Sequence, residues 1–131
     1  MSKQYISMFT LVVDDYDKAI NYYKDCLRFS LVEDTPLTKV KRWVRMKPPG
    51  DSNTCILIAK SKNETETKSI GFQTGGRVSF FLYTDSFWED YNYMLTKDVK
   101  FINEPREEEY GTVVVFEDLY GNKWDFIQPT S

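Results

Sequence analysis

The chain has 131 residues, of which 41% are hydrophobic and 16% aromatic, so it can form one domain or two small halves with a real core. Its net charge of −3 argues against a nucleic-acid partner, because neutralising phosphates requires a basic surface. The absence of histidine excludes Ser-His-Asp and Cys-His catalysis and removes the commonest ligand of zinc, nickel and iron sites.

The sequence contains no segment that resembles a membrane span or a secretion signal. No stretch approaches the roughly twenty apolar residues that cross a bilayer. The first residues lead straight into a predicted strand and lack a signal-peptide pattern. We therefore expect a cytoplasmic protein with no membrane partner. In that reducing compartment, Cys26 and Cys55 are expected to be buried free thiols.

Residues 5–60 predict a first module of one strand, one helix and three further strands. Residues 6–13 alternate between the two faces of a strand. Asp14 or Asp15 then caps a helix that runs to about Leu27. The helix buries a stripe made of Ala19, Ile20, Tyr23 and Leu27. Shorter strands are predicted over residues 30–33, 42–47 and 54–59.

Residues 61–76 are polar and are expected to form a linker, and residues 77–131 predict a second module. Its helix begins with Ser86 and Glu89, which form the pattern of a capping box. The buried stripe of this helix is predicted to be Phe87, Tyr91, Met94 and Leu95. A hairpin turn follows at residues 118–122, where Gly121 or Asn122 suits a positive φ. Residues 107–109 are expected to form an exposed acidic turn.

The two modules look like copies of one unit. Residues 8–15 can be laid over residues 79–85, and residues 55–58 over residues 124–127. Such a repeat indicates a tandem of one supersecondary unit. Because so small a module cannot bury both faces of its sheet, we expect an α+β fold in which two βαβββ modules pair into a curved, cup-shaped, eight-stranded mixed sheet.

The alternation of each strand predicts which side chains line the concave face of this cup. They are Met8, Thr10, Val12, Trp43, Arg45, Ile56, Ile58, Ser79, Phe81, Tyr83, Val113, Val115, Asp125 and Ile127. This lining is apolar and partly aromatic with a few polar groups, which is the usual composition of a small-molecule site.

Arg45 and Asp125 are the charged residues of the predicted lining. Arg45 could hold a carboxylate or phosphate, and Asp125 could accept a hydrogen bond from an amine or act as a general base. The structural alternative is that the two pair with each other, or that Asp125 pairs with Arg77 or Arg42.

Three other residues have two interpretations each. Trp43 either stacks on a ligand or fills the interior of the cup or a dimer interface. Arg106 and Tyr110 either line the rim of the cup or belong to a packed turn.

Several motifs resemble those of the vicinal oxygen chelate superfamily, which includes glyoxalase I, bleomycin-resistance proteins, fosfomycin-resistance proteins and extradiol dioxygenases. The resemblance covers essentially the whole chain. Its motifs are residues 11–15 with 19–23, residues 26–29, and residues 116–122 with 124–127. Residues 41–44, 73–78, 105–106 and 110–113 look like a bacterial subgroup labelled glyoxalase-like or bleomycin-resistance-like.

The resemblance implies two paired βαβββ modules, usually a homodimer, and a small-molecule pocket. It also implies that metal-using members place their ligands at positions that here hold Met8, Ile56, Ser79 and Asp125. Only Asp125 suits a hard divalent cation, whereas a catalytic metal normally needs about three protein ligands. We therefore expect no metal or other cofactor.

Three functions remain open from the sequence. The favoured one is a metal-independent binding protein for a small, partly aromatic molecule. The first alternative is a glyoxalase-type or lyase-type enzyme in which a divalent metal is held by Asp125 and substrate oxygens. The second alternative is a non-catalytic dimeric interaction or regulatory domain.

Overall fold

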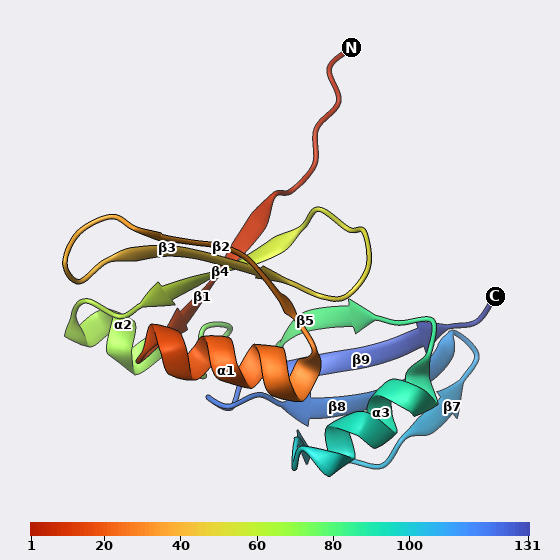
Figure 1. The fold of residues 1–131 in the computed structure, drawn as a ribbon. Coiled ribbons are helices and arrows are strands. Elements are labelled where there is room, and N and C mark those ends of the chain that lie inside the picture. Colours follow the sequence, from red (N-terminus) through yellow and green to blue (C-terminus); the bar gives the residue numbers. More distant parts are fainter. The chain divides into compact units, whose positions relative to one another are not determined.

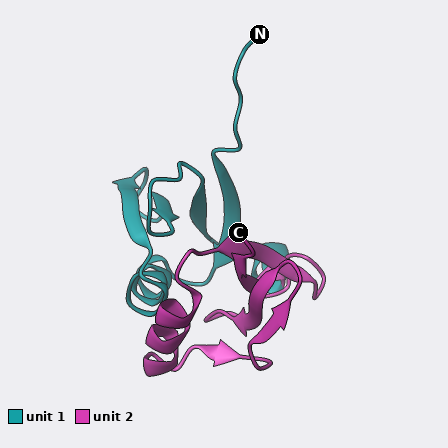
Figure 2. Cartoon of the chain, turned by 90° about the vertical axis from the view of Figure 1, so that its right-hand side faces the viewer, with its two compact units in different colours: residues 1–68 teal, residues 69–131 magenta.

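The structure is a computed structural model that describes residues 1–131, and the chain divides into two compact units, residues 1–68 and 69–131 (Figure 2). Each unit has its own β-sheet (Figure 1). The α+β class is confirmed, and unit 1 has the predicted βαβββ order. Unit 2 has the same order with one additional short strand after its helix. The strands form two hydrogen-bonded sheets, one of four and one of five strands, in place of a single eight-stranded ladder.

Unit 1 has a four-stranded sheet in the order β1-β4-β3-β2, in which β1 and β4 are parallel and the other neighbours antiparallel. Its elements are β1 (Met8–Val13), α1 (Tyr16–Leu27), β2 (Ser30–Pro36), β3 (Arg42–Lys47) and β4 (Cys55–Lys60). A short helix, α2 (Glu64–Ser69), follows within the segment expected to be a linker. None of the α2 side chains is buried, so the sequence has no apolar pattern from which this helix could be predicted.

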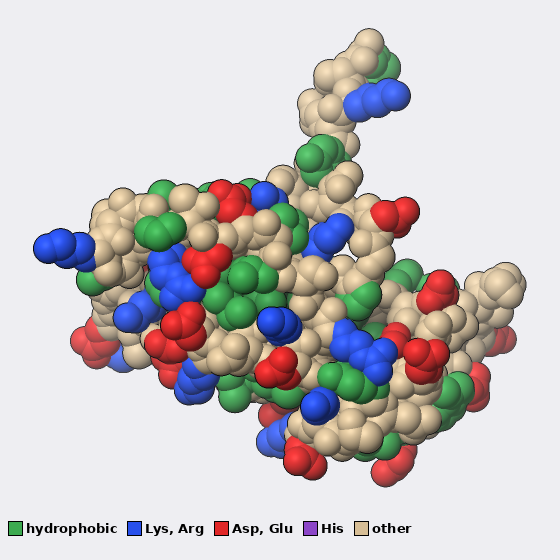
Figure 3. All heavy atoms as spheres, in the orientation of Figure 1, with side chains coloured by type: hydrophobic (Ala, Val, Ile, Leu, Met, Phe, Trp, Pro, Cys, Tyr) green, Lys and Arg blue, Asp and Glu red, His purple; other side chains and the backbone are tan.

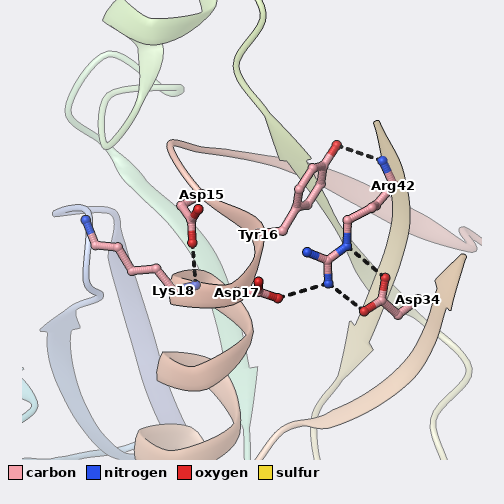
Figure 4. Close-up of polar contacts among 6 residues, drawn as sticks. All are labelled: Asp15, Tyr16, Asp17, Lys18, Asp34 and Arg42. Atoms are coloured by element: carbon pink, nitrogen blue, oxygen red, sulfur yellow. Dashed lines mark hydrogen bonds and ion pairs between the residues drawn. The ribbon is translucent and has the colours of Figure 1, made fainter. Parts of the chain in front are cut away.

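The core of unit 1 lies on one face of its sheet, against α1. The buried side chains on this face of the sheet are Leu11, Val13, Val44, Met46, Ile56 and Ile58. The predicted stripe of α1 is confirmed, because Ala19, Ile20, Tyr23 and Leu27 are all buried. The predicted cap is confirmed as well, since Asp15 accepts a hydrogen bond of 2.8 Å from the backbone N–H of Lys18 (Figure 4).

Arg42 ties β3 to β2 and to α1 (Figure 4). Its guanidinium donates two hydrogen bonds to Asp34, of 3.0 and 2.6 Å, and lies 3.0 Å from Asp17. The guanidinium also lies 5.1 Å from the centre of the Tyr16 ring. The bidentate bond holds the pKa of Asp34 below its ordinary value.

Unit 2 has a five-stranded sheet in the order β5-β9-β8-β6, with β7 also paired to β8. Its elements are β5 (Val78–Tyr83), α3 (Phe87–Thr96), β6 (Lys100–Phe101), β7 (Arg106–Glu108), β8 (Gly111–Glu117) and β9 (Lys123–Pro129). The expected acidic turn is wrong in part, because its first two residues belong to β7.

The core of unit 2 is aromatic and lies between α3 and its sheet. Phe116 stacks on Trp124 at 5.7 Å, and Phe87 of α3 stacks on Phe126 at 5.4 Å. The predicted stripe of α3 holds for Phe87 and Met94, whereas Tyr91 is half-buried and Leu95 is exposed.

The predicted capping box of α3 is wrong. The Ser86 side chain donates to Asp85 Oδ1 at 3.1 Å and forms no capping bond. The side chain of Gln128, in β9, instead accepts from the backbone N–H of Phe87 at 2.9 Å. A residue 41 positions away therefore does the capping, which a local sequence pattern could not reveal.

The predicted turn between β8 and β9 is confirmed. Gly121 has a φ of 95°, and the Asp118 N–H donates to the Asn122 carbonyl at 2.9 Å. The buried Asp118 carboxylate accepts bonds of 3.0 Å from the Asn122 N–H and from the Trp124 indole. This carboxylate therefore fixes the turn and the start of β9 together.

Two further expectations concern the whole chain. Both cysteines are free, as predicted, although only Cys55 is fully buried. A membrane-spanning helix would need more length and more apolar residues than any helix of this chain has.

On the face shown in Figure 3, acidic and basic side chains are interspersed rather than gathered in a patch of one sign.

Candidate functional site

Strand register places the candidate residues of unit 2 on the face of its sheet opposite α3, hereafter the far face of unit 2. Neighbours in register point to the same side of a sheet. Phe81 is paired with Asp125, and Asp125 with Val115. One pleat further along, Tyr83 is paired with Ile127, and Ile127 with Val113. Ser79 precedes them in β5, at an irregularity in its pairing with β9.

Asp125 is a half-buried carboxylate that forms no ion pair and accepts no hydrogen bond. Burial raises its pKa above the ordinary value, because a carboxylate removed from water is destabilised in its charged form. The positive charge of Arg106 opposes this shift. A desolvated carboxylate without a bonded cation is typical of a ligand-binding or catalytic position.

Two large aromatic side chains lie beside Asp125 and are left uncovered. Phe81 and Tyr83 are each 65% exposed, although both occupy a strand. The aliphatic side chains next to them in register, Val113 and Ile127, are buried. The far face of unit 2 thus presents two rings beside a carboxylate, on a floor of aliphatic side chains.

Arg106 lies in β7 at the edge of the same sheet, and Tyr110 lies in the turn between β7 and β8. Arg106 pairs in register with Val113 and donates a hydrogen bond of 3.0 Å to Glu108. Tyr110 is 53% exposed. Both side chains are exposed at the hairpin formed by β7 and β8.

The corresponding face of unit 1, opposite α1, is the far face of unit 1. Register places Met8 beside Cys55, Thr10 beside Leu57, and Leu57 beside Arg45 on this face. The same pairing puts Trp43, which is half-buried, on it beside Thr35 of β2.

Ile56 and Ile58 do not line the far face of unit 1, and that prediction is wrong. They pair in register with Phe9 and Leu11 and are buried on the α1 side. The cause is a slip of one residue in the comparison of the two modules, which moves every side chain of a strand to the opposite face. Leu57, which pairs with Thr10 as Asp125 pairs with Phe81, is the true counterpart of Asp125.

The contacts of Arg45, Arg42 and Arg77 show whether any of these arginines pairs with Asp125. Arg45 donates a hydrogen bond of 2.9 Å to Glu33 and lies 3.6 Å from Cys55 Sγ. Arg42 is bonded to Asp34, and Arg77 forms no ion pair. The proposed pairing of Asp125 with an arginine is therefore wrong. Arg45 is engaged by Glu33, whose pKa is lowered mainly by that bond.

The donor groups do not fit the divalent metal that the family resemblance implies. No three His, Cys, Asp or Glu side chains lie together in a way that could hold an ion. With Leu57 in place of Ile56, the four positions hold Met8, Leu57, Ser79 and Asp125, and only one of them carries a carboxylate. A hard cation prefers several oxygen ligands, which these residues do not offer.

Comparison with known proteins agrees with this fold. The chain is 50% identical over 127 residues to a protein of Shewanella frigidimarina (strain NCIMB 400), covering 96% of this chain and 94% of that one. It is 29% identical over 122 residues to YurT of Bacillus subtilis (strain 168), covering 91% and 94%.

Two crystal structures share the fold at low identity. UcmS2 superposes with a TM-score of 0.82 at 23% identity, covering 96% of this chain and 98% of UcmS2. TnmS3, described as an antibiotic binding protein from Streptomyces sp. CB03234, gives 0.77 at 22%, covering 99% of each chain. The sequence profile of one family matches residues 5–126, and the chain belongs to that family, the Glyoxalase/Bleomycin resistance protein/Dioxygenase superfamily.

Proposed function

We propose that the chain binds a small, partly aromatic molecule bearing an amine on the far face of unit 2, without a metal ion. The observation that carries this proposal is the half-buried, unpaired carboxylate of Asp125 beside the exposed rings of Phe81 and Tyr83. A protonated amine would give Asp125 the ionic partner that it lacks. Charge-assisted hydrogen bonds of this kind are about twice as strong as neutral ones.

The two rings would supply the rest of the binding energy. A ligand ring that stacks on Phe81 or Tyr83 removes apolar surface from water and adds roughly 0.5–1.5 kcal/mol per aromatic pair beyond the area term. The amine can also lie over the Tyr83 ring, where a cation is attracted by roughly 0.5–1 kcal/mol at an exposed site. The far face of unit 1 is a second place for a ring to stack, on Trp43.

The similarity to TnmS3 supports this proposal, because TnmS3 has this fold and is an antibiotic binding protein. The donor set supports the absence of a metal, since Asp125 has no second or third ligand beside it. We also propose that the protein is a homodimer, as the family resemblance implies, which size-exclusion chromatography with light scattering would test. We further propose that it is cytoplasmic, as expected from the sequence.

Calorimetric titration of chelator-treated protein with three matched probes tests the function. Phenethylamine carries a ring and a cation, phenethyl alcohol a ring without charge, and phenylacetate a ring with an anion. We expect saturable binding of phenethylamine, weaker binding of the alcohol, and loss of the difference in Asp125→Asn. Equal affinity of the protein for all three probes would contradict the assignment. Equal affinity of the unchanged protein and of Asp125→Asn for phenethylamine would contradict it as well.

The raised pKa of Asp125 favours one second candidate, an enzyme that uses this carboxylate as a general base. The protein would then turn over a glyoxalase-type or lyase-type substrate, and Asp125→Asn would abolish that turnover. Binding of phenethylamine without any metal-dependent thermal shift favours the binding protein.

A further inference from the structure

A pocket opens in unit 2 where β5 and β9 begin, beyond the residues around Asp125. Its volume is about 190 Å³. Two segments of the chain line it: Gly71, Phe72, Thr74, Gly76, Arg77, Ser79, Gly121 and Lys123. Sites that enclose drug-sized molecules measure roughly 300–1,000 Å³, so this pocket suits a single functional group or a small ion.

The lining of the pocket carries two cations and no acidic side chain. The Arg77 guanidinium forms no ion pair and no side-chain hydrogen bond. Lys123 donates only to a backbone carbonyl, that of Gly76, at 3.2 Å. Two positive groups at one pocket without a carboxylate are unusual in a chain whose net charge is −3.

Other cations of the chain are paired differently. Arg42, Arg45 and Arg106 each donate a hydrogen bond to a carboxylate. The register partner of Lys123 is Glu117, and that carboxylate lies 3.1 Å from the ammonium of Lys100. The positive charge at the pocket is therefore not neutralised by the protein itself.

The walls of the pocket are held in place by contacts on both sides. The chain approaches the Tyr120 carbonyl so closely at Gly71 that a Cβ there would collide with it. Thr74 Oγ1 donates to the Arg77 carbonyl at 2.8 Å and lies 3.1 Å from Ser79 Oγ. On the opposite wall, the Asp118 hydrogen bonds fix the turn that contains Gly121. Such a prearranged site loses little entropy when it binds a ligand.

We propose that this pocket binds an anionic group, a carboxylate or a phosphate, between Arg77 and Lys123. The planar fork of Arg77 can bond two oxygens of such a group, and the ammonium of Lys123 adds a point charge. Phe72, which is 61% exposed, offers an apolar edge for the carbon skeleton that bears the anion. This site is separate from Asp125 and does not depend on amine binding there.

A titration followed by ¹H–¹⁵N correlation spectra tests this site. The uniformly labelled full chain is titrated with sodium phosphate and, separately, with sodium acetate, at constant pH and ionic strength, with sodium chloride as the reference. We expect the amide signals of Gly71, Gly76 and Gly121 to shift along a saturation curve for at least one of the two anions. The anion with the lower dissociation constant identifies the source of the negative group.

Charge variants assign the effect to the pocket. Arg77→Gln and Lys123→Gln should each weaken binding by at least ~10-fold, the loss of a charge-assisted bond worth roughly 1.4 kcal/mol. Lys97→Gln makes the same change in net charge at the exposed end of α3 and should leave the affinity within about twofold. Well-dispersed spectra of each variant verify that it folds.

Two results would overturn the proposal. One is a linear shift with both anions that chloride reproduces, which reports bulk electrostatics only. The other is saturable binding that Arg77→Gln and Lys97→Gln weaken equally.

Discussion

Individual carboxylates in this chain have opposite electrostatic surroundings, and Asp125 and Asp34 are the clearest pair. Asp125 is desolvated without a bonded cation, which raises its pKa, whereas Asp34 is held by Arg42, which lowers its pKa. A raised pKa means that the folded state binds the proton more tightly than the unfolded state does. Ionised Asp125 therefore costs stability, and ionised Asp34 contributes it.

The pH dependence of two matched variants tests these assignments. Asp125→Asn should raise the Tm at pH 7 by roughly 1–4 °C, and the gain should shrink as the pH falls through the raised pKa towards the ordinary value of 3.8. Asp34→Asn should lower the Tm at pH 7. That loss should persist down to about 3.8 and disappear as the pH falls through the lowered pKa. Differential scanning calorimetry from pH 3 to 7 measures both, and a lower Tm for Asp125→Asn at pH 7 would contradict the desolvation argument.

The exposed rings of β5 should matter for binding and little for folding. Because Phe81 and Tyr83 are each 65% exposed, replacing either with Ala should change the free energy of unfolding by less than about 1 kcal/mol. Each replacement should weaken phenethylamine binding about fivefold, the loss of roughly 1 kcal/mol of ring contact. Phe116→Ala, in the core, should instead cost roughly 3–5 kcal/mol of stability. An unchanged affinity in both β5 variants would remove these rings from the site.

At the scale of elements, the helix of each unit covers one face of its sheet, and the far face has no helix of that unit packed on it. The sequence predicted which side of each helix packs in the core, because both helices repeat apolar residues with helical spacing. The cap of α3 and strand β7 could not be predicted from the sequence, since the cap comes from the distant Gln128 and β7 is entirely exposed. Ile56 was misplaced because a run of four apolar residues in β4, Cys55 to Ile58, gives no alternation that fixes the face.

The turn that joins β8 to β9 gives a test at this scale. Asp118→Ala should lower the free energy of unfolding by at least ~2 kcal/mol, because it leaves the Trp124 indole and buried backbone amides without an acceptor. The corresponding turn of unit 1 supplies the control, since Asp51 is exposed and Asp51→Ala should change stability by less than about 0.5 kcal/mol. Urea denaturation followed by tryptophan fluorescence measures both. Equal effects of the two variants would show that the Asp118 bonds are not what fixes the turn.

At the scale of the whole molecule, duplication explains both the fold and the position of the candidate site. The two halves share strand order, and the parallel pairing of β1 with β4 is repeated by β5 with β9. The internal repeat was therefore sufficient to predict the fold. It was insufficient for the site, because the copies differ where chemistry would occur: Leu57 in unit 1 stands where unit 2 has Asp125. The sequence also allowed Arg45 to pair with Asp125. In the structure Arg45 is bonded to Glu33 instead, so Asp125 has no bonded cation.

The pKa of the Asp125 carboxyl group, measured by ¹³C NMR with and without saturating phenethylamine, tests the central claim most directly. In the free protein the pKa should lie above its ordinary value of 3.8, because burial destabilises the charged form. A bound ammonium group should lower the pKa, since an opposite charge within about 4–6 Å favours the ionised form. A pKa that is already at or below 3.8 in the free protein, or one that the amine leaves unchanged, would contradict the account.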